Sequence, residues 1–204
     1  MHIAVAGNIG SGKTTLAAML AKHFDWEALY ESVETNPYLA SFYEDMQRWS
    51  FNLQVFFLNS RFRQVVELRK KKKTVIQDRT IYEDAYIFAP NLHAMGLMPT
   101  RDFENYTSLF ELMMQFLQPP DLLIYLRADV STLVSQIHKR GREYEVSIRL
   151  DYLNSLNERY EEWISNYDAG KLMIVDVNTI KFEEIPEDFG TIIEMVNAEL
   201  YGLF

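Results

Sequence analysis

The chain has 204 residues, and its 20 Lys and Arg residues against 29 Asp and Glu residues give a net charge of −9. Hydrophobic residues make up 48% of it, and cysteine is absent. The length suits one domain with a single continuous core, and the apolar content excludes a disordered chain. The absence of cysteine excludes a disulfide scaffold and a thiolate metal site. The acidic balance argues against a dedicated nucleic-acid-binding protein, which needs positive charge to meet phosphates.

No segment for export or membrane insertion is expected. The apolar run at the N-terminus is short and is broken at once by glycines, whereas a signal peptide needs a basic start and a longer apolar stretch. No apolar run approaches the roughly 20 residues of a transmembrane helix. We therefore expect a cytoplasmic protein without a membrane partner.

Short apolar runs alternate with helical stretches along the chain. The predicted strands cover residues 3–6, 27–30, 74–77, 122–126 and 172–175. The predicted helices cover residues 14–24, 49–72, a segment that begins at 80, 102–117, 131–139, 147–167 and 185–200. This alternation predicts an α/β fold, with a five-stranded parallel sheet flanked by helices. We expect one domain over residues 1–204.

Local signals place several helix ends. Residues 80–83 have the form of a capping box, in which Thr80 and Glu83 satisfy each other's backbone at a helix start. Pro119 and Pro120 stop the helix that precedes them. The lysine run at residues 70–73 ends another helix, where cations suit the negative pole of the helix dipole. We favour a solvated helix end there over a binding patch.

A glycine-rich stretch between the first predicted strand and helix has the spacing G-x-x-x-x-G-K-T. Its glycines let successive backbone N–H groups point at an anion, and the following helix adds its positive pole. The lysine can reach the β- and γ-phosphates, and the threonine hydroxyl can bind Mg²⁺. The stretch therefore predicts nucleoside triphosphate binding. We expect the nucleotide to contact Gly7, Asn8, Ile9, Gly10, Ser11, Gly12, Lys13, Thr14 and Thr15.

Charged residues follow two other predicted strands. Glu31 comes after the second strand, and Asp78 and Arg79 come after the third. Because ligands bind beyond the carboxyl ends of parallel strands, these side chains are expected beside the phosphate loop. One carboxylate there can act as general base on an acceptor hydroxyl, another can help to hold Mg²⁺, and an arginine can steady the transferred group. Taken singly, each is equally compatible with a surface charge in a loop.

A second basic cluster, at residues 139–142, contains Arg140 and Arg142 on either side of a glycine. In an acidic protein this pattern indicates a mobile lid over residues 139–146 that closes on the γ-phosphate and excludes water. The alternative is a solvated helix C-terminus.

Six stretches together resemble the deoxynucleoside kinase family, in particular its bacterial deoxyadenosine and deoxyguanosine kinases. They are GNIGSGKTTL at 7–16, ESVETNPYL at 31–39, FYEDMQRWSFNLQVFFLNSR at 42–61, QDRTIYEDAYIFA at 77–89, LLIYLRAD at 122–129 and KRGREYE at 139–145. The resemblance implies a three-layer P-loop kinase fold, ATP as phosphate donor with Mg²⁺, a deoxynucleoside substrate and a homodimer.

The resemblance also implies catalytic roles. Glu31 matches the proposed base for the nucleoside 5′-hydroxyl, and Ser32 follows it where the family commonly has proline. Asp78 and Arg79 match the acid near Mg²⁺ and the arginine near the 5′-oxygen and phosphoryl group. Arg140 and Arg142 match the lid arginines, and Lys13 completes the catalytic set.

Sugar and base contacts carry over in the same way. Tyr43 and Glu145 match the pair that holds the deoxyribose 3′-hydroxyl. Gln54 matches the residue whose amide reads the base edge. The residues themselves support this match, because Gln54 interrupts the apolar run 51–58 and a buried amide needs hydrogen-bond partners that a base edge provides.

Arg61 and Asp84 match a charged pair near the base that is associated with purine and cytosine substrates, and Phe88 matches the aromatic ring that stacks on the base. Arg61 lies seven positions after Gln54, on the same helix face. Asp84 and Phe88 are four positions apart and also share a face. Without the resemblance, an ordinary ion pair is the alternative interpretation of Arg61 and Asp84, and an ordinary core position is the favoured interpretation of Phe88.

We therefore predict an ATP-dependent kinase that phosphorylates the 5′-hydroxyl of a deoxynucleoside, with deoxyadenosine first. The donor adenine is expected near the loop at residues 176–182. Deoxyguanosine, deoxycytidine and thymidine stay open as alternative substrates. A nucleotide-binding module without transfer, and an NTPase that acts on nucleic acid, are weaker alternatives.

Overall fold

The computed structural model describes residues 1–30, 36–68, 70–142, 145 and 147–202. Within them one parallel sheet has the strand order β2-β3-β1-β4-β5. Its strands are β1 (His2–Gly7), β2 (Glu27–Leu29), β3 (Val75–Asp78), β4 (Leu122–Arg127) and β5 (Lys171–Asp176). The predicted five-stranded parallel sheet is thus confirmed, and the strand limits agree with the predicted ones to within one or two residues.

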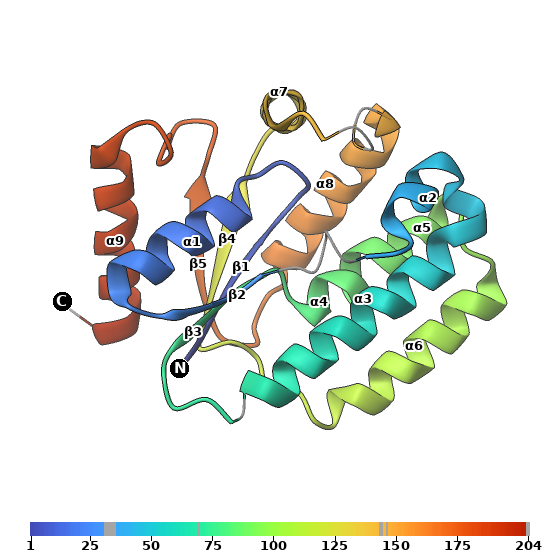
Figure 1. The fold of residues 1–204 in the computed structure, drawn as a ribbon, viewed down its shortest axis with the longest axis horizontal. Coiled ribbons are helices and arrows are strands. Elements are labelled where there is room, and N and C mark those ends of the chain that lie inside the picture. The colour runs from blue at the N-terminus through green and yellow to red at the C-terminus, as the bar shows by residue number, and fades with distance from the viewer. Residues whose placement is uncertain (31–35, 69, 143–144, 146, 203–204) are drawn as a thin grey trace.

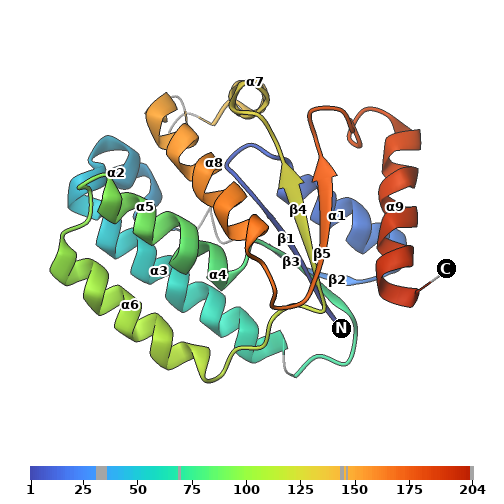
Figure 2. The ribbon, with the colours of Figure 1, turned by 180° about the vertical axis from the view of Figure 1, so that it is seen from behind.

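Helices cover both faces of this sheet (Figure 1). The helices α1 (Lys13–Phe24) and α9 (Pro186–Tyr201) lie on one side of it, and the view from behind shows several others gathered on the opposite side (Figure 2). These others include α3 (Met46–Leu68), α5 (Ala89–Ala94), α6 (Thr100–Met114) and α8 (Leu150–Ser165). None of the described helices is both long enough and apolar enough to cross a membrane.

Two hydrophobic clusters hold the layers together, one on each face of the sheet. Along β1, Ile3 and Val5 pack with α1 and α9, whereas Ala4 and Ala6 pack with the helices on the other face. This division follows from strand geometry, because successive side chains point to opposite faces. A strand buried on both faces must therefore be apolar throughout, which is why β1 and β4 are continuous apolar runs.

The helix after β3 is confirmed, but its geometry changes along its length. The capping box predicted at Thr80 and Glu83 is formed, and α4 (Ile81–Glu83) begins there. The next five residues form a π-helical turn, η1 (Asp84–Phe88), which leads directly into α5. Such turns shift the side chains that follow them and are common at functional sites.

The prediction of a helix over residues 49–72 is wrong at both ends. The helix α3 begins at Met46, after a short unpredicted helix α2 (Leu39–Glu44), and ends at Leu68. Beyond it, Lys71 and Lys73 pair with Glu27 and Asp25, which flank the start of β2. The lysine run thus follows the end of α3 and lies against neighbouring carboxylates as the chain turns toward β3.

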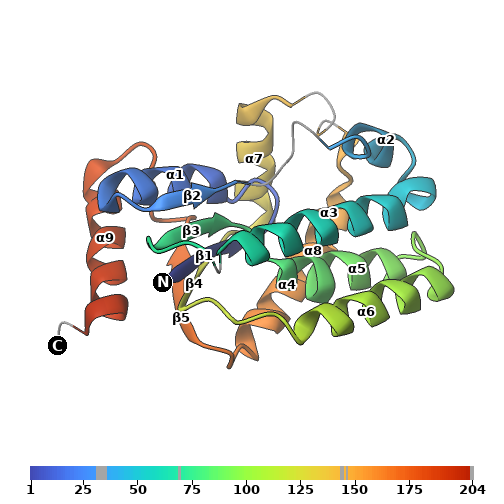
Figure 3. The same cartoon turned by 60° about the horizontal axis from the view of Figure 1, so that its bottom comes forward.

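The order of the strands brings the predicted site together. The strand β1 lies between β3 and β4, and Val5 of β1 is level with Asp78 of β3. Because all strands run in the same direction, the loop after β1 and the residues after β3 emerge at the same edge of the sheet. The helices α3, α5 and α6, which run side by side, lie beyond that edge and to one side (Figure 3).

Candidate active site

The phosphate loop leaves the sheet at the end of β1 and enters α1 at Lys13. Gly12 precedes the helix with a φ of 92°, a conformation that side chains with a Cβ rarely adopt. At Gly7, a Cβ would lie 2.9 Å from the carbonyl oxygen of Leu126 on β4, so only glycine fits there. The loop therefore curls tightly around the N-terminus of α1, an arrangement that suits an anion.

Asn8 ties this loop to α8. Its side-chain nitrogen donates to the carbonyl oxygen of Leu153 at 3.2 Å and to Oδ1 of Asn157 at 3.1 Å. Its own carbonyl oxygen accepts a hydrogen bond from Nζ of Lys13 at 2.8 Å. The Asn8 side chain thus fixes the loop to α8, and its backbone carbonyl holds the Lys13 ammonium at the loop, where phosphates would bind.

The end of β3 carries oxygen groups suited to Mg²⁺. The hydroxyl of Thr14 donates to Oδ2 of Asp78 at 2.5 Å, so a hydroxyl and a carboxylate are adjacent beside the phosphate loop. Mg²⁺ is a hard cation that proteins hold through one or two carboxylates together with substrate phosphates. In the described part of the chain there is no cluster of three or more His, Cys, Asp or Glu side chains that could hold a metal ion by itself. The hydroxyl of Thr14 and the carboxylate of Asp78 are donors that fit a Mg²⁺ ion whose other ligands would be phosphate oxygens.

Arg79, the residue after β3, is held in an unusual conformation. Its φ is 68°, in the left-handed region, and its backbone N–H donates to Val5 on β1 at 2.9 Å. The guanidinium donates to the hydroxyl of Tyr160 at 2.8 Å and lies 4.7 Å from the centre of the Phe88 ring. Strained residues of this kind persist only where the surroundings hold them, and they are concentrated at active sites.

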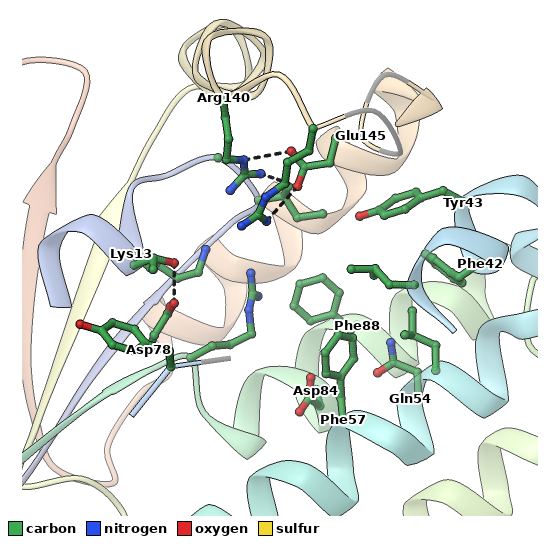
Figure 4. A pocket seen from close by; sticks show the side chains of 18 of the residues that line it. Lys13, Phe42, Tyr43, Gln54, Phe57, Asp78, Asp84, Phe88, Arg140 and Glu145 are labelled. Carbon is green, nitrogen blue, oxygen red and sulfur yellow. Dashed lines mark hydrogen bonds and ion pairs between the residues drawn. The ribbon is translucent and has the colours of Figure 1, made fainter. Parts of the chain in front are cut away.

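One cavity of about 580 Å³ joins these groups to the helices beyond the sheet edge. Figure 4 shows Lys13 and Asp78 at one end of it, and Gln54, Asp84 and Phe88 at the other. Predicted site residues that line this cavity are Ile9, Gly10, Lys13, Thr14, Tyr43, Gln54, Asp78, Arg79, Asp84, Phe88, Arg140, Arg142 and Glu145. Residues between positions 9 and 145, from six elements and the loops next to them, thus meet in one space.

Several predicted site residues lie elsewhere. Glu31 lies outside the described residues, as do three residues of the expected lid, at 143, 144 and 146. Ser11 and Gly12 line a second, smaller cavity of about 110 Å³ next to the loop after β5, where the donor adenine is expected. The remaining predicted residues that do not line the large cavity are Gly7, Asn8, Thr15 and Arg61.

The base end of the cavity contains a buried amide and a buried ion pair. Gln54 is 2% exposed, and no donor among the described residues reaches its Oε1. Arg61 lies behind Asp84 and forms an ion pair with it at 2.6 Å. Of this pair, only Asp84 borders the cavity, so Arg61 is placed to act on a ligand through Asp84.

Glu145 contacts both arginines of the predicted lid. Arg140 donates to its two carboxylate oxygens at 2.6 and 2.9 Å, and Arg142 lies 3.5 Å from Oε1. The predicted sugar-binding carboxylate and the predicted phosphate-binding arginines are therefore neighbours across the top of the cavity (Figure 4). Tyr43, the other predicted sugar contact, lines the same cavity.

Sequence reasoning missed several lining residues. Phe57 lies one turn after Gln54 on α3 and lines the cavity with it, a spacing that the helix pattern could have revealed. Leu39 and Phe42 come from α2, which was not predicted. Tyr30 and Tyr152 also line the cavity, and no local signal distinguished them from core or loop aromatics.

A three-layer α/β fold with a phosphate loop, and with Asp78 and Arg79 at the end of the neighbouring strand, defines a phosphotransferase with the P-loop kinase fold. A model of the family described as deoxynucleoside kinase matches residues 3–201. The chain therefore belongs to the deoxynucleoside kinase family, as the six sequence stretches predicted.

Curated relatives and solved structures agree with this family. The chain is 42% identical to the deoxyadenosine/deoxycytidine kinase of Bacillus subtilis (strain 168), over 91% of this chain and 88% of that one. It is 36% identical to the deoxyadenosine kinase of Dictyostelium discoideum, over 97% and 78% of the two chains. Deoxyadenosine kinase from M. mycoides, solved with the products dCMP and dCDP, superposes with a TM-score of 0.87 at 30% identity, covering 97% of this chain and all of that one.

Proposed function

We propose that this enzyme transfers the γ-phosphoryl group of ATP to the 5′-hydroxyl of a deoxynucleoside, with deoxyadenosine preferred. The observation that carries the proposal is the single cavity that runs from the Lys13 ammonium to the buried Gln54 amide. A triphosphate bound at the loop and a base bound at Gln54 would share this space. The 5′-hydroxyl would then lie between them, beside Arg79 and Asp78. Positioning and charge stabilisation carry most of the catalysis in such transfers.

The charged residues would have different roles in the transfer, according to their positions in the cavity. Lys13, Arg140 and Arg142 would stabilise charge on the triphosphate, and Arg79 would steady the transferred group. Glu31 would accept the proton of the 5′-hydroxyl, as its place after β2 and the family resemblance indicate. Thr14 and Asp78 are the residues that would hold Mg²⁺, and the ion would supply positive charge that neutralises the triphosphate.

The Gln54 amide supports adenine as the preferred base. An amide presents one donor and one acceptor side by side, and the N6 and N7 edge of adenine presents the complementary pair. At the same edge, guanine offers two acceptors, N7 and O6, so a guanine bound through that edge would leave Gln54 Oε1 without a donor. Cytosine also carries an exocyclic amino group, and relatives named for deoxyadenosine and for both deoxyadenosine and deoxycytidine are among those found. Deoxycytidine is therefore the second candidate.

A coupled assay of ATP consumption with each of the four deoxynucleosides and with adenosine tests the proposal. We expect the highest kcat/KM with deoxyadenosine and the next highest with deoxycytidine. A higher value with deoxyguanosine or thymidine would contradict the proposed base recognition. Turnover that is independent of added nucleoside would contradict the transfer itself. In the same assay, Glu31→Gln should lower kcat far more than it raises the KM for deoxyadenosine.

We also propose a homodimer formed through α3 and α6. Val66 on α3 and Leu112 on α6 are 40% and 58% exposed, and Phe116, just past the end of α6, is 51% exposed. The Phe116 ring contacts Phe62 of α3, so these apolar groups lie on one face of the molecule. Sedimentation of the wild type and of Leu112→Glu tests this, since a charge in the interface should produce monomers. A wild-type monomer at micromolar concentration would exclude the dimer.

A further inference from the structure

A buried carboxyl group that has no role in the proposed reaction lies next to Arg79. Glu83 is 0% exposed, and its Oε2 accepts the backbone N–H of Thr80 at 2.7 Å in the capping box. Its Oε1 accepts a hydrogen bond from the hydroxyl of Tyr160 at 2.8 Å and lies 3.5 Å from Nη1 of Arg79. Helix capping accounts for the contact of Oε2 only. An exposed glutamate would cap α4 equally well, so the burial and the Oε1 contacts need another explanation.

Tyr160 joins this carboxyl group to the arginine. It comes from α8, is fully buried, and its hydroxyl accepts a hydrogen bond from Nη1 of Arg79 at 2.8 Å. A hydroxyl can donate one hydrogen bond, and the Tyr160 hydroxyl donates it to Glu83. The lone pairs of the Tyr160 oxygen are therefore left to accept from the Arg79 guanidinium. Burial raises the pKa of Tyr160 well above its ordinary value, so the hydroxyl keeps its proton.

We propose that Glu83 and Tyr160 are positioning residues that act through Arg79, holding its guanidinium at the wall of the cavity where the phosphoryl group is transferred. The inference rests on the proposed role of Arg79. An arginine has long, flexible torsions, and here Tyr160, Glu83 and the Phe88 ring restrain it from three sides. A chain of hydrogen bonds in a buried site strengthens each member, so removal of one hydroxyl loosens the whole group.

The reaction is sensitive to such loosening because catalysis depends on placement. A misplacement of about 1 Å can lower the rate by about 100-fold without altering ground-state binding. Glu83 also accepts the backbone N–H of Gly7 at 3.3 Å, which offers a second route, through the phosphate loop. A variant of Tyr160 separates the two routes, since the Tyr160 hydroxyl bonds to Arg79 and Glu83, whereas Glu83 bonds to the loop directly.

The test compares Tyr160→Phe and Glu83→Gln with the matched control Tyr125→Phe. Tyr125 is also fully buried, stacks on Tyr160, and donates to Glu161 at 2.9 Å, so its variant removes the same kind of hydrogen bond away from Arg79. We expect Tyr160→Phe to lower kcat by about tenfold or more. We expect the KM values for ATP and deoxyadenosine to stay within about twofold, and the control to keep wild-type kcat. Thermal unfolding of each variant checks that the fold is retained, and Tyr160→Phe keeps the inference testable if Glu83→Gln does not fold.

A double variant decides whether the effect passes through Arg79. In an Arg79→Lys background, Tyr160→Phe should cause no further loss of kcat, because the guanidinium that it positions is gone. Independent, multiplicative losses would overturn the inference, and so would a Glu83→Gln variant that raises only the KM for ATP. If Arg79→Lys alone keeps wild-type kcat, the proposed role of Arg79 fails, and the inference fails with it. If Arg79→Lys is impaired while Tyr160→Phe is not, only the positioning inference fails.

Discussion

At the scale of single residues, Gln54 shows how a polar group in a core indicates a ligand. The amide interrupts an otherwise apolar stretch of α3, and its Oε1 has no donor among the described residues. Burial of an unpaired acceptor costs about 1–3 kcal/mol of folding free energy. A side chain with this cost at the wall of a cavity is best explained by a bound molecule that supplies the missing hydrogen bond.

We predict that Gln54→Leu weakens the binding of deoxyadenosine without lowering the stability of the fold. Loss of the base contact should raise the KM for deoxyadenosine by about 10- to 100-fold, in line with 1–3 kcal/mol for a buried polar group left unpaired. The KM for ATP should not change, because the phosphate loop lies at the other end of the cavity. Urea denaturation should show equal or greater stability than the wild type. A variant with unaltered KM would show that Gln54 does not contact the base.

At the scale of secondary-structure elements, the pair of Arg61 and Asp84 joins α3 to the π-helical turn η1. Both side chains are at most 3% exposed, and the guanidinium also lies 4.9 Å from the Phe57 ring on α3. A buried charge is tolerated where an opposite charge and further contacts accompany it. The pair therefore fixes the position of η1, and with it the position of Phe88, relative to Gln54.

Asp84→Ala should destabilise the protein strongly, because Arg61 would stay buried without this carboxylate. Removal of one partner of a buried pair costs about 3–5 kcal/mol, which is measurable as a shift of the urea midpoint. The double variant Arg61→Met/Asp84→Leu should recover part of that loss, since it removes both charges. A double variant that is less stable than Asp84→Ala would contradict this account.

The contact between β1 and β3 makes stability depend on pH. Burial lowers the pKa of His2 below 6.5, while a hydrogen bond to Gln77 at 2.9 Å opposes this shift. The unfolded chain then binds more protons at His2 than the folded one, so stability falls as the pH drops through about 6.5. Between pH 7.5 and 5.5, the free energy of unfolding should fall more in the wild type than in His2→Gln. An equal fall in both proteins would exclude His2 as the source.

At the scale of the whole molecule, the cavity couples ligand binding to stability. A ligand that binds only the folded state at 100 times its Kd adds about 2.7 kcal/mol. For a protein of this size we therefore expect ATP with Mg²⁺, or deoxyadenosine alone, to raise Tm by about 5–11 °C. Lys13→Ala should abolish the ATP shift and retain the deoxyadenosine shift, because Lys13 lies at the phosphate end only. Loss of both shifts in that variant would indicate damage to the fold instead.

The local sequence pattern was sufficient to predict a structural feature wherever that feature is built from residues that are neighbours along the chain. The phosphate loop is a contiguous motif, and the buried strands are apolar runs, so both were predicted within one or two residues. The placement of Asp78 and Arg79 beside the loop also followed from sequence, because parallel strands end at the same edge of a sheet. The capping box at Thr80 was predicted for the same reason, as all its members lie within four residues.

Only the tertiary structure decided which distant side chains meet. Arg79 and Tyr160 are 81 positions apart, and their contact depends on the packing of α8 against η1, which no local pattern encodes. The same holds for the partners of the lysine run, because Lys71 and Lys73 pair with Glu27 and Asp25, more than 40 positions earlier in the chain. The sequence by itself determined the acidic surface, the fold class and the phosphate loop, since these depend on composition and on neighbours along the chain. The cavity and the groups that hold Arg79 depend on how whole layers pack, so only the folded chain could reveal them.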